Sequence, residues 1–223
     1  MRCFILHKRR IFLFLYVIIA LSVAVFSGIG ALAYGLSNSE YRMPITSVKT
    51  EDKVIALSVN VYEYTDTNVL IKNLGKNKAT FFISEAFQEM FSDKVRSIIQ
   101  AGHSIGILED EPENFSKNEL YDRLAVRIER MARLTGKNTD LIRFDTENAD
   151  EALVKTVYSL GLFPIQWNDP EQLSAGNIVL IDEKTAEEFT KKSATDGLKT
   201  VTVDELILKN GFKVDFSGVQ SAL

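Results

Sequence analysis

The chain has 223 residues, enough for one domain of ordinary size and an accessory segment, and its formal net charge is −4. Four of its 26 basic residues lie within the first ten positions, so the rest carries 22 basic against 30 acidic residues, which argues against nucleic acid or an anionic membrane surface as a partner. The only cysteine is Cys3, which excludes disulfides, thiolate metal ligands and a cysteine nucleophile from the rest of the chain.

Residues 11–33 carry no charged side chain and are long enough to cross a bilayer. A helix of this length rises about 35 Å, and a hydrocarbon core is roughly 30 Å thick. Because positive charge stays on the cytoplasmic side, the basic flank, residues 1–10, predicts that the C-terminal part lies outside. We expect a single-pass, extracytoplasmic membrane protein, or a secreted one if a signal peptidase cleaves after Ala31-Leu32-Ala33.

Residues 34–52 are polar and are typical of a linker. After them, strand-like and helix-like segments alternate to about residue 210, followed by a short tail, residues 211–223. Continuous apolar runs predict strands at residues 54–59, 79–83, 104–108, 141–144, 163–167, 177–181 and 200–203. Helical spacing and capping patterns predict helices at residues 67–74, 85–101, 116–134, 148–160 and 183–192, and a last turn capped by Asp204.

Such repeated βα units predict a mainly parallel sheet covered by helices. Periodicity does not distinguish an open sheet from a barrel, but ligand sites lie at the carboxyl ends of the strands in both. The residues to inspect therefore follow the predicted strands, at positions 58–62, 108–112, 144–148, 167–169 and 182.

Six segments, taken in order, resemble the polysaccharide deacetylase family, also called the NodB-homology domain. The segment KVIALSVNVYEYTDTNVLIKNLGKNKATFFIS resembles its opening strand, T-F-D-D-G motif, helix and K-A-T-F-F strand, and AGHSIGI resembles its G-H-E-I-G-N. The segments LTGKNTDLIRF, GLFPIQWNDP, GNIVLID and LKTVTVDELI resemble later parts. The resemblance covers residues 53–208 and implies a domain over residues 53–210. It implies an α/β fold, a distorted and incomplete (β/α) barrel. The transmembrane helix predicted above from the uncharged run precedes this domain.

The positions that the family uses for catalysis hold other residues here. By the resemblance, the general base of the T-F-D-D-G motif corresponds to Asn60 and its metal-binding aspartate to Val61. The two metal-binding histidines correspond to Leu108 and Pro112, and the late histidine that acts as general acid corresponds to Asp182.

Metal-assisted hydrolysis needs about three side-chain ligands around a Lewis acid, and a group that accepts a proton. These replacements supply neither, so the family's zinc is not expected and no catalytic residue is assigned. Outside the basic flank the chain has one histidine, His103, at the start of a strand and away from the expected site. We interpret it as a hydrogen-bonded structural residue.

Polar and aromatic residues at the strand ends remain candidates for a residual glycan-binding or polar cleft: Asn60, Tyr62, Arg143, Asp145, Trp167, Asp169 and Asp182. The acidic cluster of Glu109, Asp110, Glu111 and Glu113 matches no cation-binding loop and is interpreted as a solvated rim.

The leading hypothesis is a catalytically inactive, membrane-anchored domain that binds cell-wall glycan or serves envelope assembly. One alternative is a divergent deacetylase or other hydrolase that uses the acidic residues. The other is a structural module that binds an envelope protein.

Overall fold

The computed structural model describes residues 43–112, 115–146, 151–168 and 173–223. Its main sheet has the strand order β6–β5–β4–β3–β2–β7, and β8 also pairs with β2. All these pairs are parallel, so the carboxyl ends of the strands lie at the same edge. The strands are β2 (Val54–Val61), β3 (Thr80–Ile83), β4 (Ser104–Glu109), β5 (Leu141–Phe144), β6 (Phe163–Pro164), β7 (Ile178–Leu180) and β8 (Lys199–Val201).

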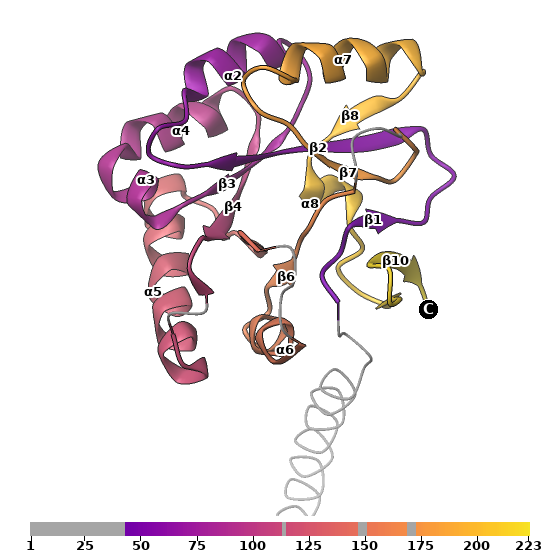
Figure 1. Ribbon diagram of the computed structural model, residues 1–223. Coiled ribbons are helices and arrows are strands. Elements are labelled where there is room, and N and C mark those ends of the chain that lie inside the picture. The colour runs from indigo at the N-terminus through magenta and orange to yellow at the C-terminus, as the bar shows by residue number, and fades with distance from the viewer. Residues whose placement is uncertain (1–42, 113–114, 147–150, 169–172) are drawn as a thin grey trace, which may run out of the picture. The chain divides into compact units, whose positions relative to one another are not determined.

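Helices follow the strands and cover the outside of the curved sheet, as Figure 1 shows. They are α2 (Thr67–Leu74), α3 (Glu85–Met90), α4 (Ser92–Gln100), α5 (Lys117–Thr135), α6 (Glu151–Ser159) and α7 (Ala186–Thr195). The short helix α8 (Val203–Leu206) instead contributes Val203 and Leu206 to the core inside the curve. Side chains alternate between the two faces of a strand. Along β2, Ile55, Leu57, Val59 and Val61 join the core on the helix side, whereas Ala56 joins the core inside the curve.

Residues 45–48 lie in the gap between β6 and β7. Ile45 bridges Ile165, just after β6, and Ser47 bridges Asn177, just before β7. Backbone hydrogen bonds join Ile45 N to Pro164 O and Gln166 N to Ile45 O, both at 2.8 Å. The sheet is therefore a distorted, incomplete barrel of parallel strands, as the resemblance implied.

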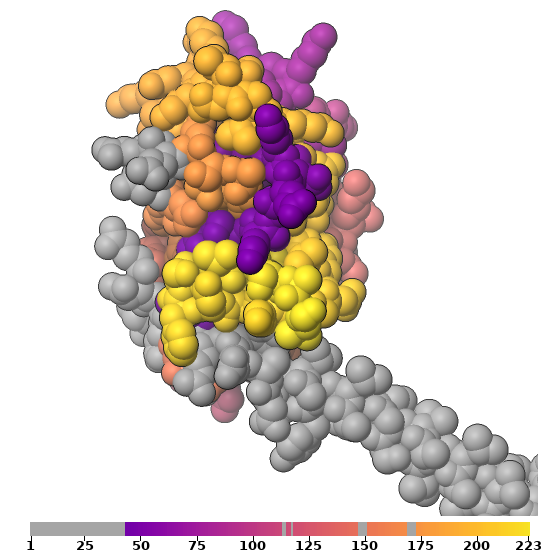
Figure 2. Space-filling model, turned by 90° about the vertical axis from the view of Figure 1, so that its right-hand side faces the viewer, coloured from indigo at the N-terminus to yellow at the C-terminus, as the bar shows by residue number. Residues whose placement is uncertain are grey.

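The same segment also forms a small second sheet with the end of the chain. It has the order β1 (Ser47–Val48), β10 (Val219–Ala222) and β9 (Phe212–Val214), with Ser47 opposite Val219. Figure 2 shows the C-terminal residues, in yellow, against the indigo residues at the start of the described chain. The described parts of the segments assigned above to a linker and a tail are thus ordered secondary structure.

Several element boundaries differ from the sequence expectation. The single helix predicted for residues 85–101 is two helices, because Phe91 adopts φ −131° and ψ 47° between α3 and α4. Thr202, not Asp204, is the N-cap of α8, in a capping box with Glu205. Position 148, where the sequence predicts the start of a helix, lies outside the described residues.

No helix within the described residues is long and apolar enough to cross a bilayer. The segment for which a span is predicted, residues 11–33, lies outside them.

Candidate functional site

A cleft of about 500 Å³ lies at the carboxyl ends of β2, β5 and β7, the edge at which folds of this class place their ligand sites. We call it the polar cleft. Its lining residues among those described are Asn60, Tyr62, Tyr64, Thr65, Asp145, Trp167, Leu180, Ile181, Asp182, Glu183, Thr185 and Phe189. Five of the seven residues proposed from the sequence therefore meet in one cleft. Arg143 is buried, and Asp169 lies outside the described residues.

Strand alternation places Asn60 and its neighbour Val61 on opposite faces of β2. Val61 is fully buried in the core on the helix side. Asn60 faces the interior of the barrel, where its Oδ1 accepts a hydrogen bond from Arg143 Nη1 at 3.0 Å. The residue that, by the resemblance, corresponds to the family's general base is thus an amide that is bonded to a guanidinium.

Arg143 is fully buried, and each of its three guanidinium nitrogens donates to an oxygen. Nη2 donates to Ser58 Oγ at 2.9 Å, and Nε donates to the Ile165 carbonyl at 3.4 Å. Ser58 lies two residues before Asn60 on the same face of β2, and its hydroxyl in turn donates to the Val179 carbonyl at 2.9 Å. The side chain of Arg143 therefore ties β2, β5 and the segment after β6 together.

The charge of Arg143 is stabilised mainly by neutral groups. Its Cζ lies 4.1 Å from the ring centroid of Phe82 and 5.1 Å from that of Trp167. Burial lowers the pKa of Arg143 to about 9, and nearby Tyr62 and Asp145 oppose this shift. The guanidinium stays charged at neutral pH, and among the described residues no carboxylate forms an ion pair with it.

Tyr62 connects the floor of the polar cleft to its rim. Its hydroxyl donates to Asp145 Oδ2 at 2.6 Å and accepts from Asn60 Nδ2 at 3.4 Å. Burial raises the pKa of Tyr62 well above its usual value, and the bond to Asp145 adds to this effect. The Tyr64 ring stacks on the Tyr62 ring at 5.2 Å and is 78% exposed, so an aromatic face is open to solvent beside the cleft.

Asp182 is the residue that, by the resemblance, corresponds to the family's general acid, and its carboxylate holds the loop before α7. Oδ1 accepts hydrogen bonds from Lys184 N, Thr185 N and Thr185 Oγ1 at 3.0, 2.8 and 2.7 Å. Burial would raise the pKa of Asp182, but these hydrogen bonds outweigh it, and the pKa lies below its usual value. Asp182 is therefore ionised at neutral pH and has no proton to donate to a leaving group.

The donor set does not fit the zinc that this family implies. Val61 and Leu108 are fully buried in apolar clusters, and Pro112 is buried, so none of the three offers a side-chain nitrogen or oxygen. In the described part of the chain, no group of three His, Cys, Asp or Glu side chains could hold a metal ion.

Glu109 is not part of a solvated acidic rim, which corrects the expectation from the sequence. Its side chain is fully buried and pairs with Arg127, which is also fully buried, at 2.9 Å. Burial raises the pKa of Glu109, while Arg127 and Arg123 oppose that shift. Of the other acidic residues in that cluster, Asp110 is half-buried, Glu111 is exposed, and position 113 lies outside the described residues.

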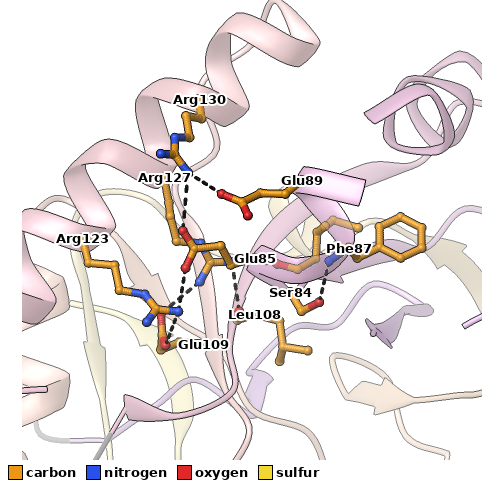
Figure 3. A network of polar contacts seen from close by, with 10 residues as sticks. Ser84, Glu85, Phe87, Glu89, Leu108, Glu109, Arg123, Arg127 and Arg130 are labelled. Atoms are coloured by element: carbon orange, nitrogen blue, oxygen red, sulfur yellow. Dashed lines mark hydrogen bonds and ion pairs between the residues drawn. The ribbon is translucent and has the colours of Figure 1, made fainter. Parts of the chain in front are cut away.

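Figure 3 shows that this pair belongs to a network between α5 and α3. Arg127 Nη2 donates to the carbonyls of Ile83 and Leu108 at 3.0 and 3.1 Å. Arg123 lies 2.7 Å from Glu85 and 3.5 Å from Glu109. The network attaches α5 to the ends of β3 and β4, on the outer side of the sheet.

His103 has the structural role expected from the sequence. It is buried, its Nδ1 accepts a hydrogen bond from Ala79 N at 3.3 Å, and its ring lies 5.1 Å from that of Phe81. Burial lowers its pKa, so the imidazole is neutral at neutral pH.

Ser58 is one of the strand-end positions that the sequence singles out, and the period of two along β2 places it on the same face as Asn60. Sequence reasoning missed Glu183 and Phe189 as cleft residues. Glu183 lies two residues after the end of a predicted strand, where cleft residues are found. Phe189 lies inside α7, and its contribution to the cleft depends on tertiary packing that no local pattern reveals.

No family model matches the sequence, and no curated protein matches it. Solved structures do match. A family 4 carbohydrate esterase from Bacillus anthracis has a TM-score of 0.68 at 18% identity, over 80% of this chain and 93% of that chain. BA3943, a family 4 pseudoenzyme from Bacillus anthracis, has a TM-score of 0.65 at 19% identity, over 82% and 74%. The peptidoglycan N-acetylglucosamine deacetylase Bc1960 has a TM-score of 0.67 at 18% identity, over 75% and 94%. These likenesses confirm the fold that the resemblance implied.

Proposed function

We propose that this chain is a membrane-anchored, extracytoplasmic member of the polysaccharide deacetylase fold that binds cell-envelope glycan in the polar cleft without hydrolysing it. One observation carries the proposal. A cleft persists at the carboxyl ends of the strands, while the positions that would hold the metal carry Val61, Leu108 and Pro112.

The aromatic groups of the cleft support a carbohydrate ligand. Pyranose rings have an apolar face that packs on aromatic rings, and hydroxyls that need hydrogen-bond partners. Tyr64 offers an exposed ring, Trp167 is half-buried, and Asn60 and Asp145 supply polar atoms close by.

Non-catalytic chains of this fold have precedent among the solved structures. BA3943 is described as a pseudoenzyme, and a mutant of it is described as having restored enzymatic activity. A protein of this fold can thus keep its architecture without its activity, which is the condition that we propose here.

The anchor rests on the sequence. Residues 11–33 are uncharged, and a basic flank precedes them. This arrangement favours a single span with the domain outside the cytoplasm, although cleavage after Ala33 would give a secreted domain with the same cleft.

Hydrolysis is tested with the full-length protein, purified in detergent with added zinc. We expect no acetate release from N-acetylated chitooligosaccharides or peptidoglycan above a buffer control, and substoichiometric zinc by elemental analysis. Turnover with stoichiometric zinc would reject the proposal. Turnover without zinc that Asp145→Ala abolishes would favour the divergent hydrolase.

Glycan binding is measured on the same protein by tryptophan fluorescence. Trp167 is the only tryptophan and lines the cleft, so the signal reports on the cleft. Envelope oligosaccharides should change its fluorescence, and Tyr64→Ala should weaken binding about fivefold or more, since stacking on an aromatic ring contributes on the order of 1 kcal/mol. Tyr121→Ala, which removes an exposed tyrosine from α5, is the matched control. Absence of binding to any envelope glycan would favour the protein-binding module instead.

A further inference from the structure

We infer that the polar cleft selects sugars with free, protonated amino groups, as in de-N-acetylated glycan, over their N-acetylated forms. This inference rests on the proposed glycan-binding function and names the ligand's chemical class. Three lining residues are acidic, Asp145, Asp182 and Glu183, and the described lining includes no lysine, arginine or histidine. A cleft with this lining attracts cations.

The fold holds all three carboxylates in place. Asp182 accepts three hydrogen bonds from its own loop, as described above. Asp145 accepts from the Tyr62 hydroxyl, and Glu183 Oε1 accepts from Asp66 N at 3.0 Å. A carboxylate has about four acceptor positions, so each can still accept a hydrogen bond from an ammonium group. Groups that are already ordered lose little side-chain entropy when the ligand binds.

Arg143 offers no hydrogen-bond donor to a ligand in the cleft, although its charge lies close to Asp145. Its side chain is fully buried, and its three nitrogens donate to Asn60, Ser58 and the Ile165 carbonyl. An anionic sugar would therefore meet carboxylates in the cleft without a cationic side chain in the described lining to bind it.

The aromatic rings add a second attraction for an ammonium group. A cation above the face of a tyrosine or tryptophan ring is stabilised by the ring quadrupole. Tyr62, Tyr64, Trp167 and Phe189 all line the cleft. The combination of carboxylates with aromatic faces suits an organic cation with an apolar body.

A simple metal ion fits this arrangement poorly. In the described part of the chain no three acidic or histidine side chains converge as metal ligands would. Carboxylates that are spread along a cleft instead suit an extended ligand that carries one amine per sugar unit.

The test compares a glucosamine tetramer with the N-acetylglucosamine tetramer, titrated into the full-length protein in detergent and followed by Trp167 fluorescence and calorimetry. We expect the amino form to bind about tenfold more tightly, from two or three partly exposed ion pairs. Its affinity should fall as salt is raised, because salt screens exposed charges, while that of the N-acetylated form should change little.

Amide variants of the cleft carboxylates test whether their charge, and not the shape of their side chains, determines the preference for amino sugars. Asp145→Asn keeps an acceptor for the Tyr62 hydroxyl but removes one charge, and should weaken the glucosamine tetramer about threefold. Asp145→Asn with Glu183→Gln should weaken it about tenfold, and both variants should weaken the glucosamine tetramer more than the N-acetylated tetramer. Glu51→Gln, at the opposite end of β2, removes an exposed charge outside the cleft and is the control.

Equal or tighter binding of the N-acetylated tetramer, or no response of the amino form to salt and to Asp145→Asn, would overturn the inference while the glycan-binding function stands. Absence of binding by both tetramers, when the fold is intact by circular dichroism, would overturn the inference and the proposed function together.

Discussion

Arg143 places a positive charge inside the barrel in a chain whose general-base position carries an amide. A buried guanidinium is stable only when its donors are satisfied. Here Asn60, Ser58 and the Ile165 carbonyl accept one hydrogen bond from each of its three nitrogens, and the rings of Phe82 and Trp167 cover the group. The amide of Asn60 thus accepts a hydrogen bond from Arg143 but supplies no countercharge.

This arrangement predicts the effect of Asn60→Asp. The introduced carboxylate would accept the same 3.0 Å hydrogen bond from Arg143 and would form an ion pair with it. We expect the free energy of unfolding at pH 7 to rise by about 1–2 kcal/mol, measured by urea denaturation. Hydrolysis should not return, because Leu108 and Pro112 still offer no metal ligand.

The stability of Asn60→Asp at different pH values tests whether the ion pair causes the effect. A carboxyl paired with Arg143 has a lower pKa in the folded than in the unfolded state. The added stability should therefore be complete above the unfolded pKa of about 3.9 and be lost as pH falls through the folded value. Asn60→Leu should instead destabilise the protein, by about 1–3 kcal/mol, since Nη1 loses its acceptor. A lower stability of Asn60→Asp at pH 7 would contradict the argument.

At the scale of the elements, the sequence predicts well the helices and strands that show a clear apolar run or a capping pattern. Residues 67–74 and 141–144 match α2 and β5 at both ends, and Ser116 caps α5 as its S-x-x-E pattern predicted. The break at Phe91 was not predictable, because the apolar spacing continues across it. The strands β1 and β9 have two and three residues, too few for a period to show, and β1 pairs with a segment more than 170 positions away.

The candidate site was predictable in position but not in detail. The predicted parallel sheet placed Asn60, Asp145 and Asp182 at one edge, because the carboxyl ends of parallel strands meet there. The burial of Glu109 was not predictable from an acidic run. Its partner Arg127, in contrast, could have been identified from the helical period. One face of α5 carries Leu120, Leu124, Arg127 and Met131, and Arg127 is the one charged residue among these four.

The attachment of α5 through Arg127 predicts a large effect of Arg127→Met. The substitution leaves the Glu109 carboxylate buried, with only Arg123 nearby at 3.5 Å. We expect a loss of about 3 kcal/mol or more at pH 7 in urea denaturation. Arg130→Met, which removes an exposed ion pair with Glu89 on the same helix, should cost less than about 1 kcal/mol.

The loss caused by Arg127→Met should shrink at low pH. Arg127 opposes the upward pKa shift of Glu109, so its removal raises the folded pKa further. A carboxyl whose folded pKa lies above the unfolded value loses stability as pH rises through that range. The destabilisation should therefore be smaller near pH 4 than at pH 7, and adding Glu109→Gln to Arg127→Met should recover part of it. A loss that is independent of pH would show that packing, not charge, attaches α5.

At the scale of the whole molecule, the described domain is an incomplete barrel whose gap is spanned by its own N-terminal segment. Val48 N donates to Gly176 O, and Gly176 N donates to Val54 O, both at 2.8 Å. Gly176 has φ +82°, and a Cβ at this position would overlap the carbonyl oxygen of Val48. This glycine allows β1 to approach the turn that precedes β7.

We therefore expect Gly176→Ala to destabilise the protein by more than about 2 kcal/mol, since the overlap falls on backbone that cannot move without breaking β1 from the barrel. Gly197→Ala is the matched control. It has φ +68° and nothing within 4 Å of its Cβ, so it should cost only the strain of its backbone, about 1–2 kcal/mol. Thermal unfolding of both variants gives the comparison, and equal losses would show that β1 is not held at this contact.

The parallel pairing of β1 with β10 has a mechanical consequence. Thr46 N donates to Gly218 O at 2.9 Å, and Lys49 N donates to Gln220 O at 2.8 Å, so the two strands run side by side in the same direction. Consider a force that pulls Ile45 toward the N-terminal end of β1 and Ala222 toward the C-terminal end of β10. It loads these hydrogen bonds in shear, all at once, instead of opening them one after another. Tension between those two points is therefore resisted by this short pair of strands together with the bonds of Ile45 to Pro164 and Gln166.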